Sequence, residues 1–159
     1  MPLPPARARF NSNINPAFNP RINPKATASL NPLFSPWLNP VQNGRISPKF
    51  NRSLNPIYSP AHNPTFNALL DPKQTSKYSG LCRWSPDSEL AGYVVNTSNK
   101  AVFLLFDLKV EWTAFAIDNQ QQGYNIFDLK DEWTGYLVRN ALGGLNEFNL
   151  EGDWLGFIM

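Results

Sequence analysis

The sequence predicts an all-β protein that is built from two different repeats, one in each half of the chain. In the second half, a line of residues that begins with an aromatic side chain recurs four times at nearly equal spacing, from Trp84, Phe106, Phe127 and Phe148. In the first half, Asn-Pro or Ser-Pro pairs recur every four residues. Fourteen of the 15 prolines precede residue 73, which excludes a long helix or a flat sheet there. Self-similarity at a fixed period is typical of repeat architectures.

The first repeat divides the chain from Asn11 to Gln74 into sixteen tetrads. Most tetrads begin with Asn or Ser followed by Pro, and most end in an apolar residue, as in Asn15-Pro16-Ala17-Phe18. Pro pre-sets φ for the second position of a β-turn, and the Asn or Ser side chain accepts a hydrogen bond from a backbone amide two residues later. We therefore expect a chain of turns whose fourth positions form an apolar stripe.

The fourth positions also suggest a longer unit. Phe stands second in every group of four tetrads, and Ile or Leu stands third, so the sequence predicts four 16-residue units. Two structures fit this pattern. One is a squared, solenoid-like stack of coils with Phe above Phe, which resembles a pentapeptide-repeat prism with shorter sides. The other is an extended ribbon of turns laid against a partner surface. The Phe residues that would stack are Phe18, Phe34, Phe50 and Phe66.

The second repeat predicts strands. Each unit has two short segments rich in aromatic and β-branched residues, which favour strands, on either side of a charged turn. Polar stretches with Asn, Gln or Gly separate the units. We therefore expect eight short strands that form four hairpins. The four unit lines are 84–93, 106–115, 127–136 and 148–157.

The recurring line of an aromatic residue, Asp, Leu, a turn Gly and a second Gly before an aromatic residue resembles the four-fold β-flower proteins and, more distantly, tryptophan-glycine repeats. The last unit, from Phe148 to Ile158, carries it best. Ser88, Val110 and Asp131 replace the turn Gly in the other units, and Ala114 replaces the second Gly. The resemblance covers about half of the chain. It implies four hairpins arranged around a pseudo-four-fold axis, and it brings no catalytic residues.

Three tryptophans of this half each follow an Asp or Asn by five residues. A buried indole N–H needs a hydrogen-bond partner, so the two side chains could bond across each hairpin. Alternatively, the Asp and Asn side chains cap the backbone of the turn. The pattern leaves both explanations open. The pairs are Asp107 with Trp112, Asp128 with Trp133, and Asn149 with Trp154.

Composition divides the chain near residues 73–77. We expect an N-terminal arm at 1–10, a tetrapeptide-repeat region at 11–74 and a four-hairpin β domain at 77–159. Residues 1–76 carry eight Lys or Arg and one acid, a net charge of +7, whereas residues 77–159 carry six bases and eleven acids, a net charge of −5. This asymmetry predicts either an anionic partner for the first half or attraction between the halves, within or between molecules.

The sequence shows few features of a particular compartment. Cys82 is the single cysteine, so no intrachain disulfide forms. We see no signal peptide, and the longest apolar run, 101–106, is far too short to span a membrane. We therefore expect no membrane span and favour the cytoplasm, while the localisation stays unknown.

Catalytic chemistry is not indicated. The single histidine, His62, and Cys82 belong to different repeats, and His62 occupies a position that is otherwise apolar. Acidic pairs such as Asp107 and Glu111 fall in turns, where solvated charges are the simpler interpretation. No phosphate-binding loop, nucleophile elbow or zinc motif occurs. We therefore predict that the protein is not an enzyme and has no catalytic residue, cofactor or metal site.

Contact with a partner is the remaining hypothesis. Trp37 stands at the third position of its tetrad, which should face outward, where neighbouring tetrads have Arg or Lys. The residues expected to contact a partner are Trp37, Arg21, Lys25, Arg45 and Lys49. Nucleic acid is not favoured, because most aromatic side chains of this half belong to the inward column. We predict a structural or interaction protein that self-assembles or docks on a larger assembly. The alternative is a module that binds carbohydrate or protein through the β-repeat domain.

Overall fold

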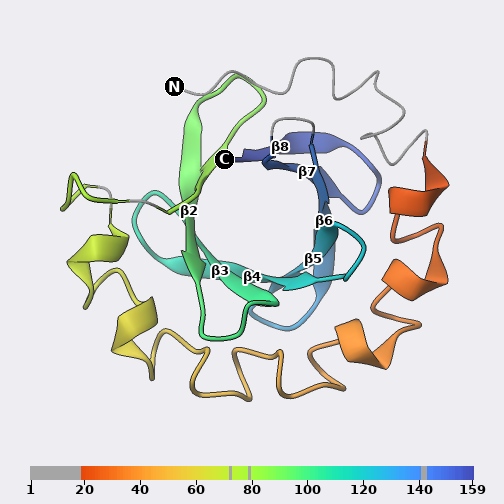
Figure 1. The fold of residues 1–159 in the computed structure, drawn as a ribbon, viewed down its shortest axis with the longest axis horizontal. Coiled ribbons are helices and arrows are strands. Elements are labelled where there is room, and N and C mark those ends of the chain that lie inside the picture. Colours follow the sequence, from red (N-terminus) through yellow and green to blue (C-terminus); the bar gives the residue numbers. More distant parts are fainter. Residues whose placement is uncertain (1–18, 72, 79, 141–142) are drawn as a thin grey trace.

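The computed structural model describes residues 19–71, 73–78, 80–140 and 143–159, and it is all-β. Eight strands form a closed antiparallel barrel, in which each strand pairs with the next and β8 pairs with β1 (Figure 1). The strands are β1 (Cys82–Trp84), β2 (Leu90–Asn96), β3 (Val102–Phe106), β4 (Trp112–Asp118), β5 (Gly123–Asp128), β6 (Trp133–Arg139), β7 (Leu145–Asn149) and β8 (Trp154–Ile158).

Each repeat unit of the second half contributes one hairpin, so the prediction of eight strands in four hairpins is confirmed. Because successive strands run in opposite directions, the four hairpin turns lie at one end of the barrel and the connections between units lie at the other. We call the first the hairpin end, which comprises the turns at 85–89, 107–111, 128–132 and 149–153. The second is the loop end, which comprises 96–101, 118–123, 139–140 and 143–144.

The hairpin turns are capped by their own side chains. Asp107 Oδ1 accepts hydrogen bonds from the backbone amides of Lys109 and Glu111, each at 2.9 Å. Asp128 repeats both bonds in the next unit, and Asn149 repeats the bond from the residue four positions later. The indole of Trp112 donates instead to the carbonyl of Ala114, and that of Trp133 to the carbonyl of Gly135. Of the two explanations for the paired residues, turn capping is therefore correct for these units.

Each hairpin turn also contains one residue in the left-handed backbone conformation. In each hairpin the fourth residue of the turn segment has a positive φ, from 63° in the first unit to 90° in the last. Only one of the four units has glycine there, which is the residue that adopts this conformation without strain. The backbone geometry is thus kept although three units lack the glycine. The four residues are Ser88, Val110, Asp131 and Gly152.

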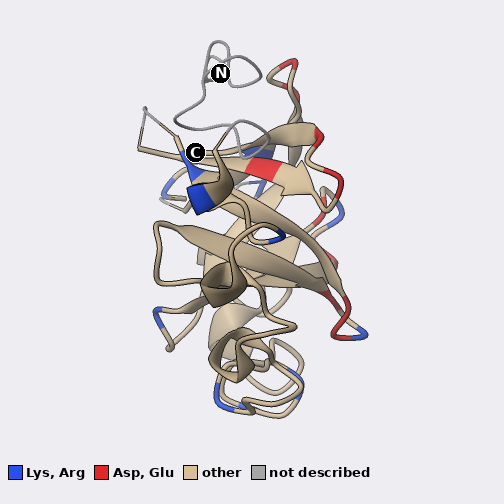
Figure 2. Cartoon of the chain, turned by 90° about the vertical axis from the view of Figure 1, so that its right-hand side faces the viewer, with Lys and Arg blue, Asp and Glu red and all other residues tan. Residues whose placement is uncertain are grey.

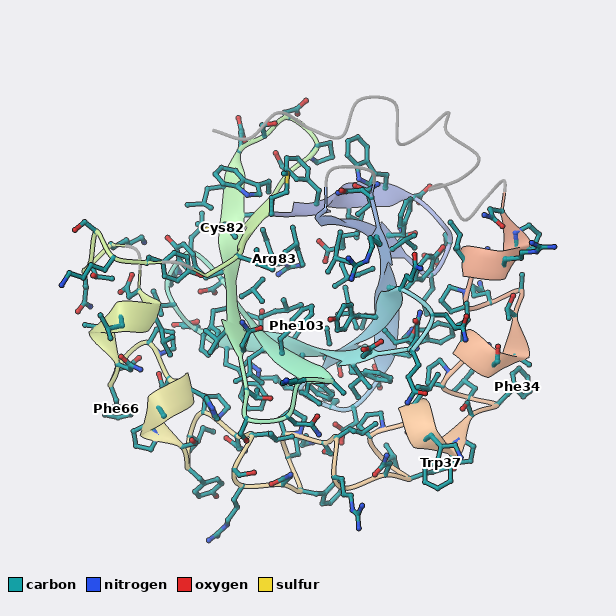
Figure 3. The ribbon with its side chains drawn as sticks, viewed as in Figure 1. Phe34, Trp37, Phe66, Cys82, Arg83 and Phe103 are labelled. Atoms are coloured by element: carbon teal, nitrogen blue, oxygen red, sulfur yellow. The ribbon has the colours of Figure 1, made fainter. Side chains whose placement is uncertain are left out.

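Both faces of the barrel sheet are buried. Side chains of one alternating set fill the interior, where Phe103 and the ion pair between Arg83 and Glu147 lie (Figure 3). The opposite set points outward and is equally apolar, and includes Tyr93, Phe115, Phe127, Tyr136 and Phe148, each at most 2% exposed. An outer barrel face of this kind needs a cover, and the first half of the chain supplies it.

The cover, which we call the strap, comprises residues 19–71 and 73–78 and follows the outside of the barrel in a single layer (Figure 1). It consists of successive turns and the short 3₁₀ helices η1 (Pro20–Ile22), η2 (Ala28–Leu30), η3 (Pro36–Leu38), η4 (Pro60–His62) and η5 (Ala68–Leu70). The predicted turn chemistry is present. The Asn31 side chain, for example, accepts from the Leu33 amide at 2.8 Å, and its carbonyl accepts from the Phe34 amide at 3.1 Å.

The fourth residue of one tetrad faces the barrel and that of the next tetrad faces solvent. The predicted apolar stripe is therefore divided into two rows. The inner row faces the barrel at every second tetrad, and consists of Ile22, Leu30, Leu38, Ile46, Leu54, His62 and Leu70. The intervening fourth positions face solvent. Phe34, Phe50 and Phe66 are 67–74% exposed, so the prediction that Phe stacks upon Phe is wrong for these residues, and Phe18 lies outside the described residues. Of the two predicted structures, the strap is the ribbon on a partner surface, and that surface is the barrel.

The strap's longer period is six tetrads instead of four. Residues 23–46 and 47–70 align with identical residues at many positions, and the lysines at 25, 49 and 73 follow the same spacing. Lys49 Nζ lies 3.6 Å from Asp131, in the turn of the third hairpin, and Lys73 Nζ donates to the carbonyl of Leu108, in the turn of the second. One strap unit of six tetrads therefore matches one barrel unit, and the strap runs around the barrel in the opposite sense to the hairpins.

Candidate binding surface and pockets

The outer surface of the strap collects most of the exposed large apolar side chains of the described residues. We call this set the outer row, and it consists of Leu33, Phe34, Trp37, Val41, Phe50, Ile57, Tyr58, Phe66 and Leu69. Figure 3 shows Phe34, Trp37 and Phe66 pointing away from the barrel, at separate places along the strap. We treat the outer row as a candidate interaction surface because exposed apolar surface, where it forms extended patches, marks interaction sites on soluble proteins.

The five residues predicted to contact a partner all lie on the strap, but they do not form one site. Trp37 is 77% exposed, and Arg21, Lys25 and Arg45 are also exposed. Lys49 is drawn to the barrel by its ion pair with Asp131. The four cations therefore lie at separate places along the strap and do not gather around Trp37. Arg45 lines a shallow depression with Phe50 and Arg52, and the Arg52 guanidinium lies 4.6 Å from the centre of the Tyr58 ring.

The hairpin end has the opposite charge. Its four turns carry two lysines against nine carboxylates, namely Asp87, Glu89, Asp107, Glu111, Asp128, Asp131, Glu132, Glu151 and Asp153. In Figure 2 most of the chain segments coloured red for Asp and Glu lie along one side of the molecule. Three exposed leucines, Leu90, Leu108 and Leu155, lie among or directly beside them. The acidic residues taken as solvated turn charges thus form one continuous end of the barrel.

Two equivalent pockets lie where the strap crosses the hairpin turns. The pocket in the second hairpin has a volume of about 340 Å³ and includes Ile57, Glu111 and Trp112. The pocket in the third has a volume of about 430 Å³ and includes Leu33, Glu132 and Trp133, which are the same positions one unit further on. Their repetition shows how regularly strap and barrel units match. Because the same pocket forms wherever a strap unit packs on a hairpin turn, we attribute both pockets to this packing and not to ligand binding.

A third cavity is not repeated among the described residues. It has a volume of about 500 Å³ and lies between the strap and the β4–β5 loop, and Trp37 is among the residues that line it. Sequence reasoning selected Trp37 but missed its neighbours, the polar loop residues from Asp118 to Gln121. The signal that could have found them is a comparison of the repeat units, because the corresponding loop, 139–144, has no glutamine.

Other predicted features have these positions. His62 occupies the inner row, and Cys82 lies on β1, where burial raises the pKa of its thiol and so disfavours the reactive thiolate. Within the described ranges, no three His, Cys, Asp or Glu side chains are grouped so that they could hold a metal ion. Nor does the described part of the chain contain a helix with the length and apolar character needed to cross a membrane.

Comparison of the chain with protein-family models, with curated proteins and with solved structures gives no match. The resemblance of the hairpin units to β-flower proteins therefore remains an expectation from sequence.

Proposed function

We propose that this is a non-enzymatic structural protein that assembles with copies of itself, the outer row of one copy contacting the hairpin end of the next. The observation that carries the proposal is the exposure of the outer row. These side chains lie on the strap, whose inner row packs on the barrel. Burying them against a second copy would remove apolar surface from water, which favours association by about 25 cal/mol per Å².

Charge complementarity selects a second copy as the partner. The described strap carries seven Lys or Arg and a single acid, Asp71, whereas the hairpin end is strongly acidic. Opposite potentials on two surfaces speed their encounter and disfavour wrong partners. Both surfaces also expose large apolar side chains, which would be buried against each other in the contact. The exposed leucines of the hairpin end, such as Leu108 and Leu155, would contact the outer row.

The two surfaces are different parts of the molecule, so this contact is heterologous. Heterologous contacts produce rings when the rotation between subunits closes, and open filaments when it does not. The proposed assembly is therefore a ring or a filament and not a two-fold dimer.

A charge-swap experiment tests this arrangement. One variant carries Arg45→Glu with Arg52→Glu on the strap, and the other carries Glu111→Lys with Glu132→Lys at the hairpin end; all four side chains are exposed. Each variant alone should associate more weakly than the natural protein in sedimentation velocity, because like charges then face each other at the swapped positions. Mixing the two variants should restore association, since one variant's strap then complements the other's hairpin end.

The matched control is Lys100→Glu, an exposed residue of the loop end that belongs to neither surface, which should associate like the natural protein. Electron microscopy of the natural protein should show rings or filaments. A natural protein that stays monomeric at millimolar concentration and low salt would contradict the proposal. So would charge-swap variants that associate as well alone as together.

A further inference from the structure

We propose that the cavity between the strap and the β4–β5 loop (118–123) binds a neutral saccharide, with the Trp37 indole as its stacking wall. This proposal does not depend on self-assembly. The volume of about 500 Å³ falls within the range of ordinary ligand pockets, roughly 300–1,000 Å³. Buried apolar residues of the strap and of β4, among them Leu38, Ile46 and Ile117, form part of the lining.

The lining has the chemistry that recognises sugars. The negative face of an indole attracts the polarised C–H groups of a pyranose ring, and an exposed indole can stack on such a ring. Amides and hydroxyls can both donate to and accept from sugar hydroxyls. The amide and hydroxyl residues of the lining are Ser29, Ser35, Asn43, Asn119, Gln120 and Gln121. Among the described residues no lysine or arginine lines the cavity and one carboxylate, Asp118, does, so a neutral sugar fits better than an acidic one.

Several of these groups are already held in place. Asn43 Nδ2 donates to the carbonyl of Trp37 at 3.1 Å, which fixes the backbone that carries the indole. Asp118 Oδ1 accepts from the Gln120 amide at 2.7 Å and shapes the loop. Among the described residues, the side-chain amides of Gln120 and Gln121 make no hydrogen bond, so their donors and acceptors are available to a ligand. An indole carried on a fixed backbone beside available amides is suited to binding a sugar.

The repeats of this chain show which of these residues packing requires. Asn119 recurs as Asn140 in the next loop, and both side chains accept from the glycine amide four residues later, so this asparagine serves the loop fold. Trp37 does not recur, because Ala61 occupies the same position in the next strap unit and is also exposed. The architecture therefore has no need of a tryptophan there.

The loop glutamines, like Trp37, are not required by the architecture. Residues 120–122 are three glutamines, and two of them have a positive φ, 64° at Gln120 and 67° at Gln122. The equivalent loop has Gly143 in place of Gln122, with a φ of 83°. A glutamine in a left-handed conformation is strained because its Cβ crowds the backbone, and glycine avoids that strain. Strain of this kind is typical of functional sites, and of the two strained glutamines Gln120 lines the cavity.

The repeat also supplies variants that should fold. Trp37→Ala copies the natural residue at position 61, and Phe34→Ala is the control, since it removes an exposed aromatic side chain of the same strap that does not line the cavity. Isothermal titration calorimetry would measure binding of five neutral hexasaccharides made of β-1,4-glucose, β-1,3-glucose, β-1,4-mannose, β-1,4-xylose and β-1,4-N-acetylglucosamine. Thermal unfolding of each variant would confirm an unchanged fold, and the titrations would be made at protein concentrations at which sedimentation velocity shows the natural protein and every variant to be monomeric.

At least one of these saccharides should bind the natural protein. Trp37→Ala should weaken that binding at least about tenfold, and Gln121→Ala by a smaller factor, because stacking contributes a large share of sugar affinity. Phe34→Ala should change the affinity less than about twofold. The proposal is overturned if none of the five saccharides binds at millimolar concentration. It is also overturned if Trp37→Ala binds as well as the natural protein, or if both aromatic variants weaken binding equally.

Discussion

Asn125 Nδ2 on the outer face of β5 donates a 3.0 Å hydrogen bond to the carbonyl oxygen of Leu30 in the strap. The two residues are 95 positions apart in the sequence, and both are fully buried. The bond therefore lies inside the interface of strap and barrel. It ties the register of the strap to that of the barrel, since shifting the strap by one tetrad would bring a different carbonyl to Asn125.

Replacing Asn125 should weaken the whole fold. Asn125→Ala leaves the buried Leu30 carbonyl without a donor, and such a group costs about 1–3 kcal/mol. We expect the free energy of unfolding, measured by urea denaturation, to fall by that amount. Lys109→Ala is the control, because this exposed lysine uses only its backbone amide, and its change should stay within about 0.5 kcal/mol. Equal losses from the two variants would contradict the role given to Asn125.

Ser88→Gly should stabilise the first hairpin. Ser88 has a φ of 63°, and its hydroxyl is buried without a hydrogen-bond partner among the described residues. Glycine relieves both penalties, and its own entropic cost is about 0.5–1 kcal/mol. The net gain in the free energy of unfolding should be about 1 kcal/mol. Gly152→Ser at the equivalent position should lower it by a similar amount, and a loss of stability in Ser88→Gly would show that the turn is not strained.

Asp131 should make stability depend on pH. Burial raises the pKa of its carboxyl group, and the nearby Lys49 only partly offsets this. The folded state therefore holds the proton more tightly than the unfolded state, so this group contributes less stability as pH rises through its raised pKa. Asp131→Asn, measured by urea denaturation from pH 3 to pH 7, should gain stability relative to the natural protein as pH rises. A difference that is constant over this range would contradict the raised pKa.

Much of the architecture could be predicted from local patterns. The repeat units of the second half predicted four hairpins because turn residues and strand-forming residues are close together in the sequence. The Asn side chains likewise predicted the turns of the strap, since each one bonds two residues ahead. The direction that Phe34, Phe50 and Phe66 face could not be predicted in this way. It depends on which side of alternate tetrads meets the barrel, and that is decided by packing between halves of the chain.

The closure of the barrel and its cover escaped prediction for a related reason. Outward-facing residues such as Phe115 and Tyr136 are as apolar as those inside, so the sequence does not show two faces of different polarity. Their burial becomes clear only when the strap is placed over them. Trp37 was selected as the exception in its tetrad, but the cavity beside it required the β4–β5 loop, which belongs to the other half of the chain.

The central claim is that the strap buries one row of side chains on the barrel and leaves the other free for partners. Leu54 and Phe50 test it most directly, because they are one tetrad apart yet 1% and 67% exposed. Urea denaturation of Leu54→Ala should show a loss of about 2–5 kcal/mol in the free energy of unfolding. Phe50→Ala should change it by less than about 0.5 kcal/mol. A loss at Phe50 that equals or exceeds the loss at Leu54 would contradict the account.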